Sequence, residues 1–207
     1  MIRNTSIRFT TMLCLSAALF FTPSLRTNFA AETSKSILAD VQTGSVTIKR
    51  IGRMSFAPNG VLLIADIGSG AVVAIETGDT GPVKKLKTRV NDVDKKIATA
   101  LGVSTADLSI ADMAVNPESG MIYVSAIRKT DNTSAIITFD ADGKLTILDL
   151  TDTRFVRVPL PVGEGSQIRA ISGVEYTDGR ILAAGQSNEE FSSKIFSLPL
   201  PLTHGKS

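Results

Sequence analysis

Short runs of alternating apolar and polar residues recur along this chain at a nearly constant spacing. An alternating run, a tight turn and an apolar run follow one another in "MSFAPNGVLLIAD" from Met54, in "MAVNPESGMIYVSA" from Met113 and in "VEYTDGRILAAG" from Val174. The turn glycines, which are 60 and then 59 residues apart, are Gly60, Gly120 and Gly179. A period of this length predicts three copies of one structural unit.

Each copy predicts a meander of antiparallel strands. Period-two alternation indicates a half-buried strand, and Pro, Asn, Asp and Gly between apolar runs indicate tight turns. In the second copy, Asp142-Gly143 forms a typical two-residue hairpin turn. Because such a sheet has two faces to bury, radial stacking of the copies predicts a β-propeller. We therefore predict an all-β fold, a partial propeller of about three four-stranded antiparallel blades at about 40–90, 108–160 and 168–200.

A short helical insertion is predicted between the first two blades, at about 91–107. Its apolar residues have helical spacing, at Val93, Ile97 and Leu101. Asn91 can cap this helix and Gly102 can end it. A second short turn, capped by Ser104 or Thr105, follows. We expect the insertion to be a surface decoration whose apolar side packs on a sheet edge.

The first 31 residues have the layout of a secretory signal peptide. Arg3 and Arg8 precede the apolar run Met12–Phe21, and the small residues Ala30 and Ala31 stand near a cleavage point that the sequence does not fix. The run is shorter than the roughly 20 residues that a membrane-spanning helix needs. An uncleaved anchor is the alternative. The sequence thus predicts export to the periplasm or the extracellular space, with residues 32–207 as an incomplete propeller domain and no membrane span after cleavage.

Loss of residues 1–31 changes the charge and the cysteine content. Three of the 22 basic residues leave with them and none of the 20 acidic ones, so the formal net charge changes from +2 to −1. No basic domain is left to attract a nucleic acid. Cys14, the single cysteine, leaves as well, which excludes disulfides and thiolate metal sites from the remaining chain.

The stretch "FAPNGVLLIAD", Phe56 to Asp66, resembles the strand–turn–strand core of NHL-type and gluconolactonase-type propellers of secreted bacterial proteins. The resemblance extends over Lys49 to Leu198 as a repeat pattern only, and it implies the fold rather than an activity. Propellers commonly close with four to eight blades. Three copies therefore predict the N-terminal part of a longer propeller, or a ring completed by self-association.

Three residues are candidates for a ligand site at the mouth of the axial channel. Arg53 and Asp112 precede the first strands of neighbouring copies at matching positions, so we expect both to lie near one axis, where they could bind a small anionic or polyol ligand. A salt bridge between the copies is the alternative. Asp66 ends the second strand of the first copy, where it could contact a ligand or accept backbone N–H groups of its own blade.

Catalytic, metal and cofactor sites have little support in the sequence. His204 is the single histidine and lies close to the end of the chain, so we expect it in a loose tail. Asp140 and Asp142 resemble part of a calcium loop, but no later glutamate completes it, and we interpret them as a plain turn. The gluconolactonase resemblance implies a metal-binding carboxylate near the start of the first repeat, where Arg53 stands.

The sequence therefore predicts an exported binding or scaffold module without catalysis by this chain alone and without a cofactor. Its partner would be a small ligand or a protein that the sequence does not identify. The alternative is a fragment of a metal-dependent lactonase-like or hydrolase-like propeller enzyme.

Overall fold

A computed structural model of the protein describes residues 36–207. The predicted signal peptide and Cys14 lie outside the described residues. Within them the fold is all-β, as predicted, with several antiparallel sheets, none of which is closed. The helices of this part of the chain lack the length and apolar character needed to cross a membrane.

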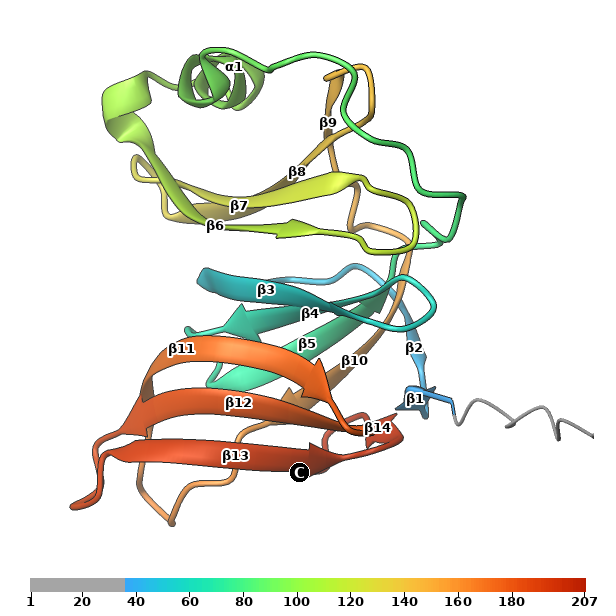
Figure 1. Ribbon diagram of the computed structural model, residues 1–207. Coiled ribbons are helices and arrows are strands. Elements are labelled where there is room, and N and C mark those ends of the chain that lie inside the picture. Colours follow the sequence, from blue (N-terminus) through green and yellow to red (C-terminus); the bar gives the residue numbers. More distant parts are fainter. Residues whose placement is uncertain (1–35) are drawn as a thin grey trace, which may run out of the picture. The chain divides into compact units, whose positions relative to one another are not determined.

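Three antiparallel sheets form where the three copies were predicted (Figure 1). Sheet 1 contains β3 (Ile51–Ala57), β4 (Val61–Asp66) and β5 (Ala71–Glu76). Sheet 2 contains β6 (Leu108–Val115), β7 (Ile122–Arg128), β8 (Thr133–Phe139) and β9 (Leu145–Ile147). Sheet 3 contains β11 (Ile168–Thr177), β12 (Arg180–Ser187) and β13 (Ser193–Pro199). A short parallel pair joins β1 (Leu38–Ala39) to β14 (Leu202–Thr203).

The strand after β9 joins sheet 1 instead of sheet 2. β10 (Thr153–Pro159), which lies inside the predicted blade 108–160, pairs with β5 through Val156 and Ala74. β2 (Gln42–Gly44) then pairs with β10, so sheet 1 has the order β2-β10-β5-β4-β3. Burial explains this placement, because Val156 and Val158 are fully buried in the core on sheet 1. The sheets have five, four and three strands instead of four each.

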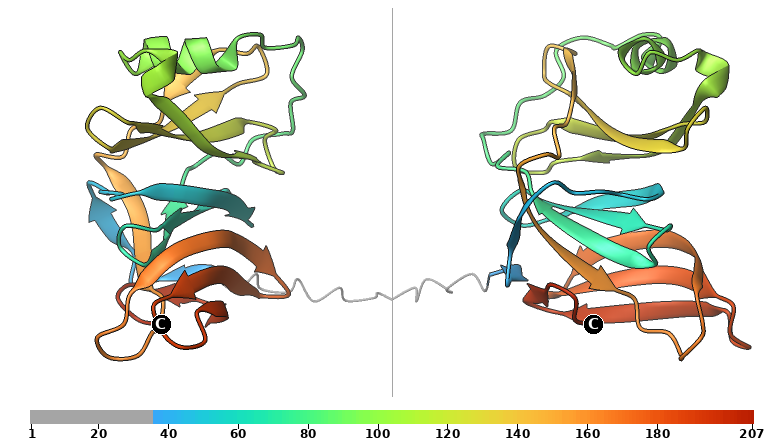
Figure 2. Two further views of the ribbon diagram at one scale, coloured as in Figure 1. Left: turned by 90° about the vertical axis from the view of Figure 1, so that its left-hand side faces the viewer. Right: turned by 180° about the vertical axis from the view of Figure 1, so that it is seen from behind.

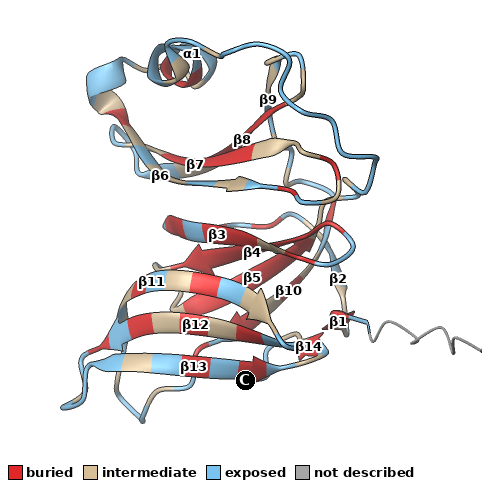
Figure 3. Cartoon of the chain, viewed as in Figure 1, coloured by how far each residue is buried: buried red, intermediate tan, exposed pale blue. Residues whose placement is uncertain are grey.

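Sheet 1 lies between sheet 2 and sheet 3, so the first copy of the sequence occupies the middle of the stack. In Figure 2 the teal strands of sheet 1 separate the yellow-green strands of sheet 2 from the red strands of sheet 3. One core packs Leu62 and Ile64 of β4 against Tyr123 of sheet 2, and another packs Leu63 of β4 against Ile181 of sheet 3. β4 is buried along its whole length because both of its faces are covered (Figure 3).

The predicted helical insertion is present and covers the outer face of sheet 2. Helix α1 (Val93–Ala100) buries Ile97 and Ala98 against Val124 and Ile137 of the sheet. The helix packs on the face of the sheet rather than on its edge. Its charged side faces solvent (Figure 3).

The caps of the insertion differ in one respect from the prediction. The residue before α1 is Asp92, in a left-handed conformation without a side-chain capping bond, and not the expected Asn91. Gly102 follows the helix with a positive φ of 67°, as a C-terminal glycine does. Ser104 caps the 3₁₀ turn Thr105–Asp107 by accepting a hydrogen bond from the Asp107 N–H.

The first strands of the three sheets share a backbone irregularity. A β-bulge interrupts the pairing between Ile51 and Met54 in β3, between Ile110 and Asp112 in β6, and between Ile171 and Gly173 in β11. A bulge bends its strand and turns the side chains beside it in a new direction. Arg53 and Asp112, two of the candidate site residues, lie at these bulges.

Candidate functional site

Arg53 and Asp112 meet directly, as their matching positions suggested. The Arg53 Nη1 lies 3.1 Å from the Asp112 Oδ1, and the side chains are 54% and 18% exposed. The other carboxylate oxygen of Asp112 accepts the N–H of Met54 at 2.8 Å. Both oxygens of Asp112 are therefore engaged with the first sheet, which is the geometry of a contact between sheets.

Two serines of sheet 2 satisfy the remaining polar groups of the same bulge. The Ser134 Oγ accepts the N–H of Ile51 at 3.0 Å, and the Ser125 hydroxyl donates to the carbonyl of Gly52 at 3.0 Å. A bulge leaves backbone groups without ladder partners, and a buried unpaired group costs about 1–3 kcal/mol. Asp112, Ser125 and Ser134 together supply those partners from the neighbouring sheet.

Asp66 makes a separate set of contacts. Its side chain is fully buried, accepts the N–H of Arg50 at 3.0 Å and pairs with the Arg157 Nη1 at 2.7 Å. Burial alone would raise the pKa of Asp66, but hydrogen bonds from the Arg50 N–H and from the Ser69 and Arg157 side chains lower the pKa below its ordinary value. Its contacts hold β10 and the start of β3 to β4. The three predicted site residues thus fall into two separate groups.

The lowered pKa of Asp66 predicts a loss of stability in acid. A carboxyl whose folded pKa lies below its unfolded value of about 3.9 stabilises the fold above that value and loses the contribution as pH falls through the folded pKa. We expect the free energy of unfolding to decline on acidification below about pH 5, and to decline less steeply in Asp66→Asn. Urea unfolding at a series of pH values measures both slopes. Equal slopes in the two proteins would contradict this assignment.

A buried polar cluster joins the segment after β5 to the turn of the second copy, and the sequence pattern did not reveal it. The Asp79 Oδ2 accepts hydrogen bonds from Asn116 at 2.8 Å, from Ser119 at 2.6 Å and from Tyr123 at 3.1 Å. Burial, followed by the charge of Asp79, raises the pKa of Tyr123 above its ordinary value. The polar turn "NPES" was the only signal of this cluster, because the connector that carries Asp79 has no counterpart in the other copies.

A groove of about 310 Å³ lies where the first strands of all three sheets come together. We call it the first-strand groove, and its lining residues are Met54, Ser55, Phe56, Met113, Ala114, Val115, Pro117 and Glu175. Met113 and Val115 are 61% and 50% exposed, although both are large apolar residues. The Ser55 Oγ is buried and has no hydrogen-bond partner among residues 36–207. An apolar wall with an unpaired hydroxyl and one carboxylate is a common composition for a ligand site.

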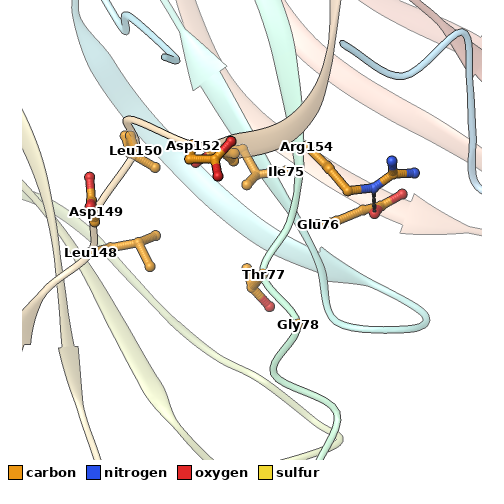
Figure 4. A pocket seen from close by; sticks show the side chains of 10 residues that line it. Ile75, Glu76, Thr77, Gly78, Leu148, Asp149, Leu150, Asp152 and Arg154 are labelled. Carbon is orange, nitrogen blue, oxygen red and sulfur yellow. Dashed lines mark hydrogen bonds and ion pairs between the residues drawn. The ribbon is translucent and has the colours of Figure 1, made fainter. Parts of the chain in front are cut away.

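A second pocket, also of about 310 Å³, lies between the end of β5 and the segment that leads from β9 to β10 (Figure 4). Glu76 and Arg154 form an ion pair of 2.6 Å across one side. Asp149 on the other side accepts the N–H and the hydroxyl of Thr151, and these hydrogen bonds lower its pKa. Two acidic residues of this pocket, Glu76 and Asp149, are thus already bound to other groups of the protein. We consider the first-strand groove the stronger candidate, because all three sheets contribute to it.

The remaining residues singled out in the sequence have local roles. The Asp140 Oδ1 accepts the N–H groups of Asp142 and Lys144, and Asp142 pairs with Lys87, which is the expected plain turn. His204 differs from the expectation, because the Nδ1 accepts the N–H of Arg157 at 3.3 Å and the ring packs edge-on against Phe155. The pairing of β14 with β1 holds this segment in place.

The described residues hold no group of three or more His, Cys, Asp or Glu side chains arranged to bind a metal ion. Comparisons with protein-family models, curated proteins and solved structures find no match to this chain.

Proposed function

We propose that this protein is an exported binding module of the β-propeller type, that the first-strand groove holds its ligand, and that this chain alone carries out no catalysis. The observation that supports the proposal is the convergence of β3, β6 and β11 on one groove. Propellers with repeated blades commonly place ligands where the innermost strands meet. Export rests on the predicted leader at residues 1–31.

The lining of the groove indicates the chemical class of the ligand. Met113 and Val115 offer an apolar wall, and the methionine in it adapts to apolar groups of varied shape. Glu175 lies at the same groove and can attract a cation, while the Ser55 hydroxyl can pair with a polar group. An apolar group that carries a basic end fits this lining, either in a small molecule or in a peptide side chain.

The anionic or polyol ligand considered from the sequence has less support. Arg53 was its expected binding partner, and Arg53 forms an ion pair with Asp112. An anion at this place would have to compete with that carboxylate. The hydrolase alternative meets a related obstacle, because Asp112 would have to give up Arg53 and the Met54 N–H before it could bind a metal ion.

Selection from a random peptide library tests the proposed ligand class. We expect the exported protein, whose N-terminal sequence is checked first, to enrich apolar peptides that contain Lys or Arg. Calorimetric titration of a selected peptide should show at least tenfold weaker binding to Val115→Asp, which places a charge in the groove, and several-fold weaker binding to Glu175→Gln.

Ile147→Asp is the matched control. Ile147 is an apolar residue on β9 that is 44% exposed and remote in sequence from the groove strands. Its affinity should equal that of the unchanged protein. If selected peptides bound Val115→Asp as tightly as the unchanged protein, the groove would not be the binding site.

A further inference from the structure

The outer face of sheet 3 carries residues that correspond to core residues of the other two sheets. The residues five positions after the turn glycines correspond to one another in the three sheets, and they are Ala65, Ser125 and Ala184. Their partners on the neighbouring strand are Val72 in sheet 1, Ile136 in sheet 2 and Ile195 in sheet 3. Val72 and Ile136 are 0% and 1% exposed, whereas Ile195 is 76% exposed. The third sheet therefore exposes a β-branched apolar side chain at a position that the other two sheets bury.

The two contacts between sheets use corresponding faces of the sheets. The face of sheet 2 that contains Ser125 and Ile136 packs on sheet 1, and the corresponding face of sheet 1, with Ala65 and Val72, packs on sheet 3. The corresponding face of sheet 3 contains Leu182, Ala184 and Ile195. Within the described residues nothing covers Ile195, so the stack is open at this face.

The opposite end of the stack is covered in part by α1. This helix packs Ile97 and Ala98 on the outer face of sheet 2, where Met113 and Val115 of β6 stay exposed, and its charged residues Asp94, Lys95 and Lys96 face solvent. A polar cap on the terminal unit is the usual way in which a stack of similar units ends. A head-to-tail contact would pack the outer face of sheet 2 of a second copy on sheet 3. That contact could form only if α1 of the second copy moved off its own sheet 2.

We infer that the outer face of sheet 3 docks the same face of a second copy of this chain, in a two-fold symmetric dimer. A two-fold contact uses one patch twice and closes, whereas a head-to-tail contact that does not close would grow into a fibre. The capped end disfavours the second arrangement. The face also carries one acid and one base, Glu175 and Arg180, beside Leu182, so two copies would meet without a large charge of one sign.

The size of the face sets the expected affinity. Three strands about 4.8 Å apart, with roughly eight residues of about 3.3 Å each, present an area of about 14 by 26 Å. Stable interfaces bury about 800 Å² on each partner, and smaller ones are transient. We therefore expect a reversible dimer with a dissociation constant in the micromolar range.

Sedimentation velocity of the intact protein between about 1 and 300 μM tests the inference, since this range spans the affinity expected of a small interface. The unchanged protein should shift from monomer to dimer as concentration rises. Ile195→Asp should weaken the association at least tenfold, and Ile195→Lys should do the same. Ile147→Asp should leave it unchanged. Urea unfolding of each variant shows that the fold is retained, which is expected because Ile195 is exposed.

Other results would overturn the inference. A monomer throughout the concentration range would exclude the dimer. Dissociation by Met113→Asp alone would place the contact at sheet 2 as well and point to a head-to-tail ring. Glu175 borders both the first-strand groove and the dimer face. Peptide binding is therefore measured with Val115→Asp, on β6, and dimerisation with Ile195→Asp, on β13, so failure of either proposal leaves the other standing.

Discussion

Gly120→Ala is expected to lower the free energy of unfolding by about 3 kcal/mol or more, because it combines backbone strain with a clash. Gly120 has a φ of 78°, and a left-handed conformation costs a residue with a Cβ about 1–2 kcal/mol. A Cβ at this position would lie 2.4 Å from the carbonyl oxygen of Lys84. That oxygen belongs to the backbone of the connector and cannot rotate away as a flexible side chain could.

Gly179→Ala is the matched control for this clash. Gly179 ends the corresponding turn of the third copy and has a φ of 72°, but a Cβ there would meet nothing within 4 Å. We expect its substitution to cost only the conformational strain, about 1 kcal/mol. Urea unfolding of both variants measures the difference. Equal losses would mean that the connector moves aside and that the close approach to Lys84 does not stabilise the fold.

Asp79→Ala is expected to cost about 3 kcal/mol or more, because it removes one acceptor from three donors at once. Asn116, Ser119 and Tyr123 are all buried, and each would lose its bond to the carboxylate. Asp79→Asn should cost less, since the amide oxygen still accepts hydrogen bonds. Chemical denaturation provides the free energies.

A spectroscopic titration separates this effect from a general loss of packing. Burial and the charge of Asp79 both raise the pKa of Tyr123, so removal of the charge should lower that pKa while burial persists. Ultraviolet titration follows the phenolate directly. Asp142→Ala is the control, because its ion pair with Lys87 is exposed at both side chains and should change stability by no more than about 0.5 kcal/mol. An unchanged Tyr123 titration in Asp79→Ala would contradict the cluster.

The periodic pattern predicted the local structure well and the assembly of the sheets only in part. Turn glycines and alternating runs located the strands, and matching positions brought Arg53 and Asp112 together, because these features depend on residues close in sequence or on the period itself. The pattern contains no information about which copy lies in the middle, since every copy has two apolar faces. It also could not assign β10, because "TRFVRVP" alternates as an outer strand of either sheet would.

The residues of the candidate site were likewise predicted only in part. The closeness of Arg53 and Asp112 followed from the period, which left a ligand site and an ion pair as alternatives. Asp79 lies in a connector without a counterpart, and its three donors come from the turn and strand of another sheet. Ser55 was also missed, because an unpaired buried hydroxyl is a property of packing and has no signature in the local sequence. Contacts between elements far apart in the chain were the part that the pattern could not supply.

The return of β10 to sheet 1 has a consequence for the order in which the chain can fold. Sheet 1 is the first to be synthesised, yet its register pairs Arg154 with Glu76 and with Thr43, so two of its five strands join only after the whole of sheet 2 has been made. Pairing across such long separations pays the entropy of closing a large loop and is characteristic of slow folding. Sheet 1 is therefore the first sheet to begin forming, but it cannot be completed before sheet 2 has been synthesised. During that interval the apolar edge of β5 has no strand paired with it.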